Sequence, residues 1–162
     1  MCFQLIDFSD WAIYEDAPFG SGASEKVWLC NEKTGQTGLF KFPKIKAEGN
    51  ITGEYWAEKL AYEIGKLIDI ECATVDIGIY NGRRGSMSYN FLKKNWVLNE
   101  GLHYITSDFP WYNPDKMTDE VNDLKYSLQM IEKSLFSWEI DCMCEMIVFD
   151  CLIGNTDRHH SN

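Results

Sequence analysis

The chain has 162 residues, with 15 Lys and Arg against 25 Asp and Glu, so its formal net charge is −10. It is 45% hydrophobic and 14% aromatic, which suits a globular chain with a proper core and excludes disorder, collagen and coiled coil. An acidic balance without a basic stripe argues against direct nucleic-acid binding, since phosphate neutralisation needs clustered Lys and Arg. The longest apolar stretch, residues 143–153, is too short and too charged to span a bilayer, so no membrane partner is expected.

The N-terminal residues 1–7 show neither a basic n-region nor a long apolar h-region, which favours a cytoplasmic protein. The six cysteines are expected to be free thiols, because a disulfide framework is typical of short secreted chains. Cys144 and Cys151 fall in an apolar helical stripe and are expected in the core. A zinc site that used Cys142 and Cys144 with two C-terminal histidines is disfavoured, since residues i and i+2 of a helix point apart.

The first part of the chain predicts strands around one helix. β-rich runs bounded by turn signals predict strands at residues 11–14, 27–30 and 39–42. A flexible connection, residues 18–23, separates the first two runs. Gly35 and Gly38 predict a turn before the third run, which Pro43 ends.

A helix and a hairpin follow these strands. The helix is predicted over residues 53–68, with a buried apolar stripe formed by Ala57, Leu60, Ala61, Ile64, Leu67 and Ile68. The alternating run 75–79 and the arm 85–92 are joined by the turn signal Asn81-Gly82, which predicts a β-hairpin. The arginines at positions 83 and 84 are interpreted as charges at the hairpin tip.

The remainder predicts helices. One begins at the cap Thr118 and extends to Leu135. The last one ends at Gly154 and has an apolar stripe of Ile140, Cys144, Ile147, Val148 and Cys151. The aromatic stretch 104–114, broken by prolines, predicts a loop. Together these elements predict an α+β fold with a sheet half, 1–92, a helical part, 93–162, and a cleft at their junction.

The C-terminal residues carry the first chemical signal. Asp157 and Asn162 lie five positions apart, just after the last predicted helix. In the catalytic loop of a phosphotransferase, this spacing lets the Asp accept a proton from the substrate hydroxyl while the Asn binds a metal ion. The pattern D-x-x-x-x-N is weak by itself, and a solvated turn is the plainer interpretation.

Upstream residues stand in the order that a kinase requires. Gly20 and Gly22 lie between two strands, where backbone N–H groups can approach phosphates. Lys41 lies in a strand with apolar neighbours, and Glu54 and Glu58 are i, i+4 on the following helix. Each has a plainer alternative, such as a lysine on an exposed strand face or glutamates that only solubilise the helix. The correct order strengthens the kinase interpretation.

Four segments resemble HipA-like kinases, the toxin halves of bacterial persistence modules. Residues 152–162, Leu-Ile-Gly-Asn-Thr-Asp-Arg-His-His-Ser-Asn, resemble the catalytic loop of that family. Residues 22–26 are similar to its glycine-loop block, 39–43 to its lysine strand and 53–58 to its glutamate helix. The resemblance covers residues 11–162 and implies a protein-kinase-like fold, with an antiparallel-sheet N-lobe carrying one helix and the first helices of a helical C-lobe.

The resemblance also implies roles. Lys41 would hold the α- and β-phosphates of ATP, and Glu54 would orient it, with Glu58 as the second candidate. Asp157 would be the catalytic base and Asn162 a Mg²⁺ ligand. The further nucleotide-binding residues implied belong to the glycine loop and the adenine hinge: Gly20, Ser21, Gly22, Tyr89 and Phe91.

The implied activity is ATP- and Mg²⁺-dependent phosphorylation of Ser or Thr hydroxyls on a protein. An antitoxin or the remaining C-lobe is the expected partner. Ser21, and less directly Ser24, are candidates for autophosphorylation. A phosphoinositide-type lipid kinase shares the D-R-H-x-x-N order that starts at Asp157, but the glycine-loop block and the lack of a basic surface argue against it.

Two departures from the family pattern bear on activity. Ser24 stands where the family has glutamine, and the sequence stops at Asn162, before a second metal-binding Asp. The chain is therefore expected to be the front part of a kinase, which positions a nucleotide but transfers phosphate poorly or not at all. The alternative is a non-catalytic nucleotide-binding or partner-binding fragment that keeps the fold.

Overall fold

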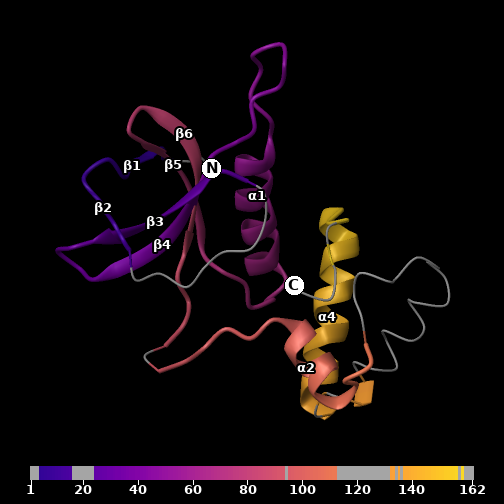
Figure 1. Ribbon diagram of the computed structural model, residues 1–162. Helices are drawn as coiled ribbons and strands as arrows, with labels where there is room; N and C mark the ends of the chain where they lie inside the picture. Colours follow the sequence, from indigo (N-terminus) through magenta and orange to yellow (C-terminus); the bar gives the residue numbers. More distant parts are fainter. Residues whose placement is uncertain are drawn as a thin grey trace. The chain divides into compact units, whose positions relative to one another are not determined.

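The computed structural model describes residues 4–15, 24–93, 95–112, 132–133, 135, 137–156 and 158. The chain divides into two compact units, residues 1–93 and 94–162. The sequence places the division next to this point, between residues 92 and 93. Figure 1 shows that the first unit holds the strands and helix α1 (Glu54–Leu67), while α2 (Gly101–Asp108) and α4 (Ser137–Ile153) belong to the second.

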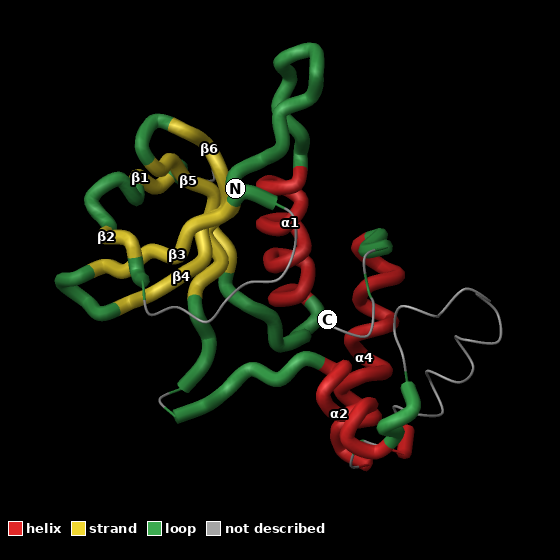
Figure 2. The backbone as a smooth tube through the Cα atoms, in the orientation of Figure 1, coloured by secondary structure: helices red, strands yellow, loops and turns green. Residues whose placement is uncertain are grey.

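The first unit is built on one six-stranded sheet (Figure 2). Its strands in chain order are β1 (Ile6–Asp7), β2 (Ala12–Ile13), β3 (Lys26–Asn31), β4 (Gln36–Lys41), β5 (Val75–Tyr80) and β6 (Arg83–Tyr89). Across the sheet the order is β1-β5-β6-β4-β3-β2. Every neighbouring pair is antiparallel except β1 with β5, which is parallel. The sheet is therefore mixed at one edge, whereas the sequence predicts only antiparallel pairing.

Turns set the register of the two central hairpins. Asn81 (φ 48°) and Gly82 (φ 78°) both adopt positive φ between β5 and β6, as a two-residue hairpin turn requires. Gly35 (φ 73°) makes the turn between β3 and β4. The expectation that Gly38 belongs to this turn is wrong, because it lies within β4 opposite Leu29. A Cβ on Gly38 would lie 2.6 Å from the sulfur of Met87, so close packing of the sheet explains the glycine.

The core of the first unit lies on one face of the sheet. Phe8, Leu29, Phe40 and Met87 are completely buried there, and the rings of Phe8 and Phe40 meet edge to face at 5.9 Å between centroids. Phe40 and Met87 are partners in the β4–β6 register. Since successive side chains of a strand point to opposite faces, Lys41 and its partner residue 86 face away from this core.

Helix α1 packs against β5 and β6. The predicted helix is confirmed, but its predicted buried stripe is wrong. Leu60 is 48% exposed and Leu67 is 84% exposed, whereas Lys59 is only 8% exposed. Charged residues therefore face the sheet, because they are paired there with other polar groups, as shown below.

The second unit contains a helix that the sequence does not predict. Residues 104–108, expected to be part of a loop, belong to α2, and Ile105 is buried. The helix ends before Pro110, whose ring disfavours helical backbone in the preceding residue. The aromatic residues and prolines of this stretch favour a loop, but it contains part of a short helix with one buried isoleucine.

Helix α4 agrees with the predicted last helix, and Gly154 (φ 70°) follows its end. Its predicted buried stripe is wrong, since Val148 is 68% exposed and Cys144 and Cys151 are exposed. The two thiols are therefore not core residues. Phe149 is buried instead, and because apolar residues occur all round this helix, their pattern does not select the buried face.

The predicted helix from Thr118 to Leu135 falls largely outside the described residues. No helix in the described part of the chain combines the length and the apolar character needed to cross a bilayer.

Close packing around Gly85 of β6 predicts that a methyl group added there destabilises the fold. Gly78 and Gly85 face each other in the register, and a Cβ on Gly85 would lie 2.3 Å from the backbone oxygen of Lys41. We expect Gly85→Ala to lower the free energy of unfolding by about 1 to 2 kcal/mol, because the backbone must move to make room. Urea denaturation measures this, with Ser88→Ala on the same strand as the control. Wild-type stability of Gly85→Ala would contradict the close approach.

Candidate functional site

An ion pair joins the sheet to α1. Lys41 is the last residue of β4, and its Nζ lies 2.8 Å from Oε1 of Glu58 on α1. The two side chains are 35% and 31% exposed. The other carboxylate oxygen, Oε2, accepts a hydrogen bond of 2.7 Å from the hydroxyl of Ser86 on β6. One carboxylate therefore connects β4, β6 and α1.

Glu54 is engaged elsewhere. Its carboxylate accepts a hydrogen bond from the Thr52 hydroxyl, and this bond lowers the pKa of Glu54. The first choice of the sequence, Glu54 as the partner of Lys41, is therefore wrong, and the second candidate, Glu58, makes the contact. The two glutamates lie four positions apart, about 6 Å along the helix axis, so only one of them lies level with Lys41.

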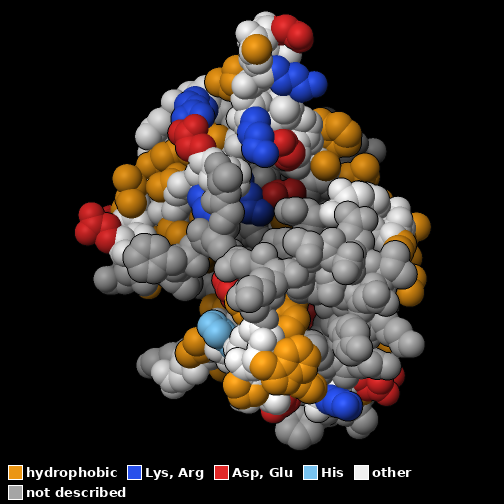
Figure 3. Space-filling view, turned by 45° about the vertical axis from the view of Figure 1, so that its right-hand side comes forward, with side chains coloured by type: hydrophobic (Ala, Val, Ile, Leu, Met, Phe, Trp, Pro, Cys, Tyr) orange, Lys and Arg blue, Asp and Glu red, His pale blue; other side chains and the backbone are white. Residues whose placement is uncertain are grey.

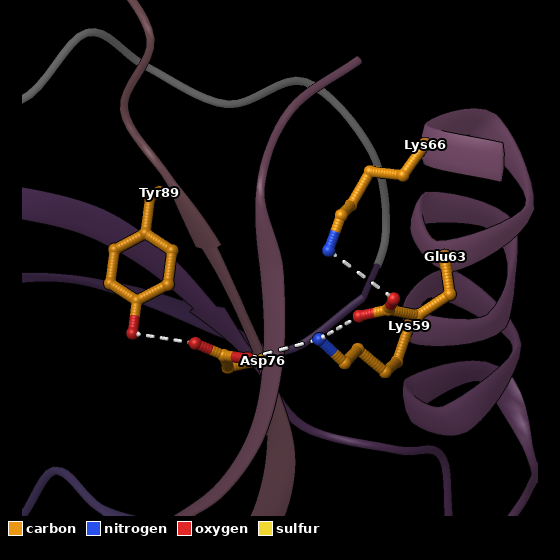
Figure 4. Close-up of polar contacts among 5 residues, drawn as sticks. All are labelled: Lys59, Glu63, Lys66, Asp76 and Tyr89. Carbon is orange, nitrogen blue, oxygen red and sulfur yellow. Dashed lines mark hydrogen bonds and ion pairs between the residues drawn. The ribbon is translucent and has the colours of Figure 1, made fainter. Parts of the chain in front are cut away.

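A second polar network joins α1 to the strands β5 and β6 (Figure 4). Lys59 Nζ is 2.7 Å from Glu63 Oε1 and 3.1 Å from Asp76 Oδ1. Lys66 also contacts Glu63, at 3.4 Å. The hydroxyl of Tyr89 donates to Asp76 Oδ2 at 3.1 Å. Asp76 therefore links a lysine of α1 to the last residue of β6.

The pKa shifts in this network follow from burial and pairing. Burial works to lower the pKa of Lys59, but its hydrogen bonds to Glu63 and Asp76 outweigh burial and leave the pKa raised. Burial raises the pKa of Tyr89, and the negative charge of Asp76 raises it further. Lys59 therefore stays charged and Tyr89 stays protonated, so both remain donors and the buried lysine is satisfied.

The predicted adenine hinge begins at Tyr89, which is also a member of this network. Backbone bonds anchor the segment, since the N–H of Tyr89 donates to Thr74 O and that of Asn90 to Thr37 O, both at 2.9 Å. The N–H of Leu92 donates to Oδ1 of Asn90 at 3.0 Å. The side chain of Phe91 is 63% exposed. The segment therefore leaves β6 in a fixed conformation.

Arg83 does more than carry charge at the hairpin tip. Its two terminal nitrogens donate to both carboxylate oxygens of Glu25, at 2.5 and 2.8 Å, and its guanidinium lies 3.9 Å from the ring centroid of Phe42. It thus fastens residue 25, which directly precedes β3, to the β5–β6 turn. The face in Figure 3 shows basic and acidic side chains side by side, in keeping with such pairing.

A third polar cluster joins α4 to the residues that follow it. The Arg158 guanidinium donates to Asp150 through Nε at 2.6 Å and through Nη2 at 3.0 Å, and Asn155 Nδ2 donates to the same carboxylate at 2.8 Å. Arg158, and after it Asn155, lower the pKa of Asp150 although burial opposes them. Asp150 is only 6% exposed, and its carboxylate holds Arg158 next to the end of α4. This cluster was not predicted from the sequence; its one sequence signal is a charged residue, Asp150, within the apolar end of the last helix.

Five predicted site residues of the glycine loop and the catalytic loop lie outside the described residues: Gly20, Ser21, Gly22, Asp157 and Asn162. Their roles stay predictions. Within the described part, no three His, Cys, Asp or Glu side chains are arranged to hold a metal ion.

The first unit therefore has the features of a kinase N-lobe: a curled sheet, one helix packed on it, and a strand lysine paired with a helix glutamate. The chain has a protein-kinase-like fold. The same fold occurs in the crystal structure of CtkA, a proinflammatory kinase from Helicobacter pylori, with a TM-score of 0.77, 20% sequence identity and 98% of this chain covered. The chain spans 54% of the length of that structure. No protein-family model and no curated protein matches the chain.

Proposed function

We propose that this chain forms the nucleotide-binding part of an ATP- and Mg²⁺-dependent kinase of the HipA-like type, which phosphorylates Ser or Thr of a protein. The ion pair between Lys41 and Glu58, within a kinase-like fold, carries the proposal. The solved structure with the same fold is itself described as a kinase. The HipA-like assignment rests on the resemblance of residues 152–162.

Lys41 supplies the cation for the phosphates. Its side chain is 35% exposed, so an incoming phosphate group reaches it without displacing core residues. A lysine ammonium is a point charge that suits the α- and β-phosphates. Glu58 keeps the ammonium at the end of β4, and the backbone N–H groups around Gly20 and Gly22 would complete the phosphate cradle.

The adenine contact is assigned to residues 90–92. The N–H groups of Asn90 and Leu92 already have partners within the chain. The N–H of Phe91 between them is therefore the proposed donor to the adenine ring. The exposed ring of Phe91 and the anchored Tyr89 flank this position.

The transfer chemistry is assigned to the segment after α4. Asp157 would accept the proton of the substrate hydroxyl, and Asn162 would bind Mg²⁺. When bound, Mg²⁺ neutralises charge on the phosphate oxygens. Arg158, the neighbour of Asp157 in the sequence, donates a hydrogen bond to Asp150 of α4, so a charged pair anchors the residue next to the proposed base. A cytoplasmic antitoxin or the remaining C-lobe is the proposed partner.

Calorimetric titration of the 162-residue chain with Mg-ATP tests the proposal. We expect binding in the micromolar to millimolar range and much weaker binding of Mg²⁺-free AMP, which lacks the phosphates beyond the first. Lack of Mg-ATP binding would refute the nucleotide site.

A further inference from the structure

Ser86 has the least exposed polar side chain in the described part of the protein, at 1%. It lies on β6, a central strand of the sheet, opposite Lys41 of β4 on one side and Ile77 of β5 on the other. A hydroxyl buried so deeply requires a hydrogen-bond partner. Its partner is Oε2 of Glu58, at 2.7 Å.

The ion pair itself does not fix Glu58 firmly. Lys41 and Glu58 are about one-third exposed, so solvent screens their attraction, and two long side chains must be ordered to form it. The Ser86 hydroxyl is different, since its short side chain is enclosed by the sheet. A bond from this rigid donor to Oε2 restricts the rotamers of Glu58 and leaves Oε1 facing Lys41.

We propose that Ser86 is a positioning residue of the nucleotide site. Its hydroxyl orients the Glu58 carboxylate, which in turn orients the Lys41 ammonium toward the phosphates. This inference rests on the proposed function. In this arrangement Ser86 acts without touching the nucleotide, which distinguishes it from the residues implied by the family resemblance.

The first test needs no nucleotide. The ¹⁵N-resolved NMR signal of the Lys41 ammonium is assigned as the one that Lys41→Met removes. We expect Ser86→Ala to move this signal toward that of an exposed lysine and to speed its proton exchange with water severalfold, because Glu58 gains rotamers that release the ammonium. Ser86→Cys, with its weak S–H donor, is expected to lie between the wild type and Ser86→Ala.

The second test is a double-mutant cycle on Mg-ATP affinity. Ser86→Ala is expected to raise the Kd for Mg-ATP about three- to fivefold, and to have less than a twofold effect in the Glu58→Ala background. The matched control is Ser9→Ala. It deletes a surface hydroxyl that accepts a hydrogen bond from the N–H of Asn81, in a turn apart from the ion pair, and it is expected to leave the Kd unchanged.

The outcomes separate the inference from the proposed function. An unchanged Lys41 signal in Ser86→Ala overturns the inference, whether or not nucleotide binds. So does an equal loss of Mg-ATP affinity in the wild-type and Glu58→Ala backgrounds, since Ser86 would then act independently of Glu58. A shifted Lys41 signal in a chain that binds no Mg-ATP supports the orienting contact and refutes the nucleotide function alone.

Discussion

Replacing Lys41 with methionine is expected to weaken Mg-ATP binding at least tenfold. The substitution removes the cation at the end of β4, whose ammonium pairs with Glu58 at 2.8 Å, while keeping a side chain of similar length. A hydrogen bond to a charged group contributes about 1.5 to 3 kcal/mol, which corresponds to a factor of about 10 to 150 in affinity. Calorimetric titration of wild type and variant measures the ratio.

The two glutamates of α1 provide a matched comparison for the same site. Glu58→Gln removes the charge that holds Lys41 and is expected to raise the Kd for Mg-ATP about fivefold. Glu54→Gln, one turn away, removes a charge whose carboxylate bonds to Thr52 instead, and is expected to change the Kd less than twofold. Equal losses in both variants, or a larger loss for Glu54→Gln, would contradict the pairing seen in the structure.

The choice between these glutamates illustrates what local signals predict. The strand around Lys41 and the helix that carries both glutamates follow from turn residues and periodicity, and both are confirmed. Which glutamate meets Lys41 depends on how far α1 extends along β5 and β6. That register is set by tertiary contacts such as the bond from Ser86, which the sequence of the helix does not contain.

The buried face of α1 could not be predicted from the sequence, for a related reason. Periodicity counts apolar residues, so it selects the face that carries Leu60, which is 48% exposed. The sheet instead receives Lys59, whose charge is satisfied by Asp76 and Glu63. Asp76 lies 17 positions from Lys59 in the sequence, and a hydrophobic pattern cannot register that a distant carboxylate makes burial of a lysine tolerable.

The hairpin between β5 and β6 shows the opposite case. Its turn was predictable from Asn81 and Gly82, because their positive φ angles are a local requirement of a two-residue connection. The role of Arg83 next to this turn was not, because Glu25 and Phe42 reach it from other parts of the chain. Backbone geometry is thus encoded locally here, whereas the pairing of charged side chains is encoded by the fold.

Asp150→Ala is expected to lower the free energy of unfolding of the second unit by about 2 to 3 kcal/mol at pH 7. Asp150 is 6% exposed and its carboxylate accepts hydrogen bonds from Arg158 and Asn155, so its removal leaves both donors without that acceptor. Part of the loss is offset because the Arg158 side chain is 35% exposed and regains water. Urea denaturation, followed by a probe in α4, measures the change.

The same cluster predicts how stability depends on pH. The pKa of Asp150 is lowered in the folded protein, mainly by Arg158, so the folded state favours the ionised carboxylate. Its contribution is therefore fully present above the pKa of the unfolded chain, about 3.9, and is lost as the pH falls through the lower pKa of the folded state. We expect Asp150→Asn to be less stable than wild type at pH 7 and to lose less stability between pH 5 and pH 2.

Asp141→Asn is the matched control, since Asp141 is an exposed aspartate on the same helix. It is expected to keep both the wild-type stability at pH 7 and the wild-type acid response. If Asp150→Asn and Asp141→Asn had the same pH profile as wild type, the Arg158 contact would not stabilise the folded chain. Arg158 would then not anchor the described residues after α4 to the helix, contrary to the contacts seen in the structure.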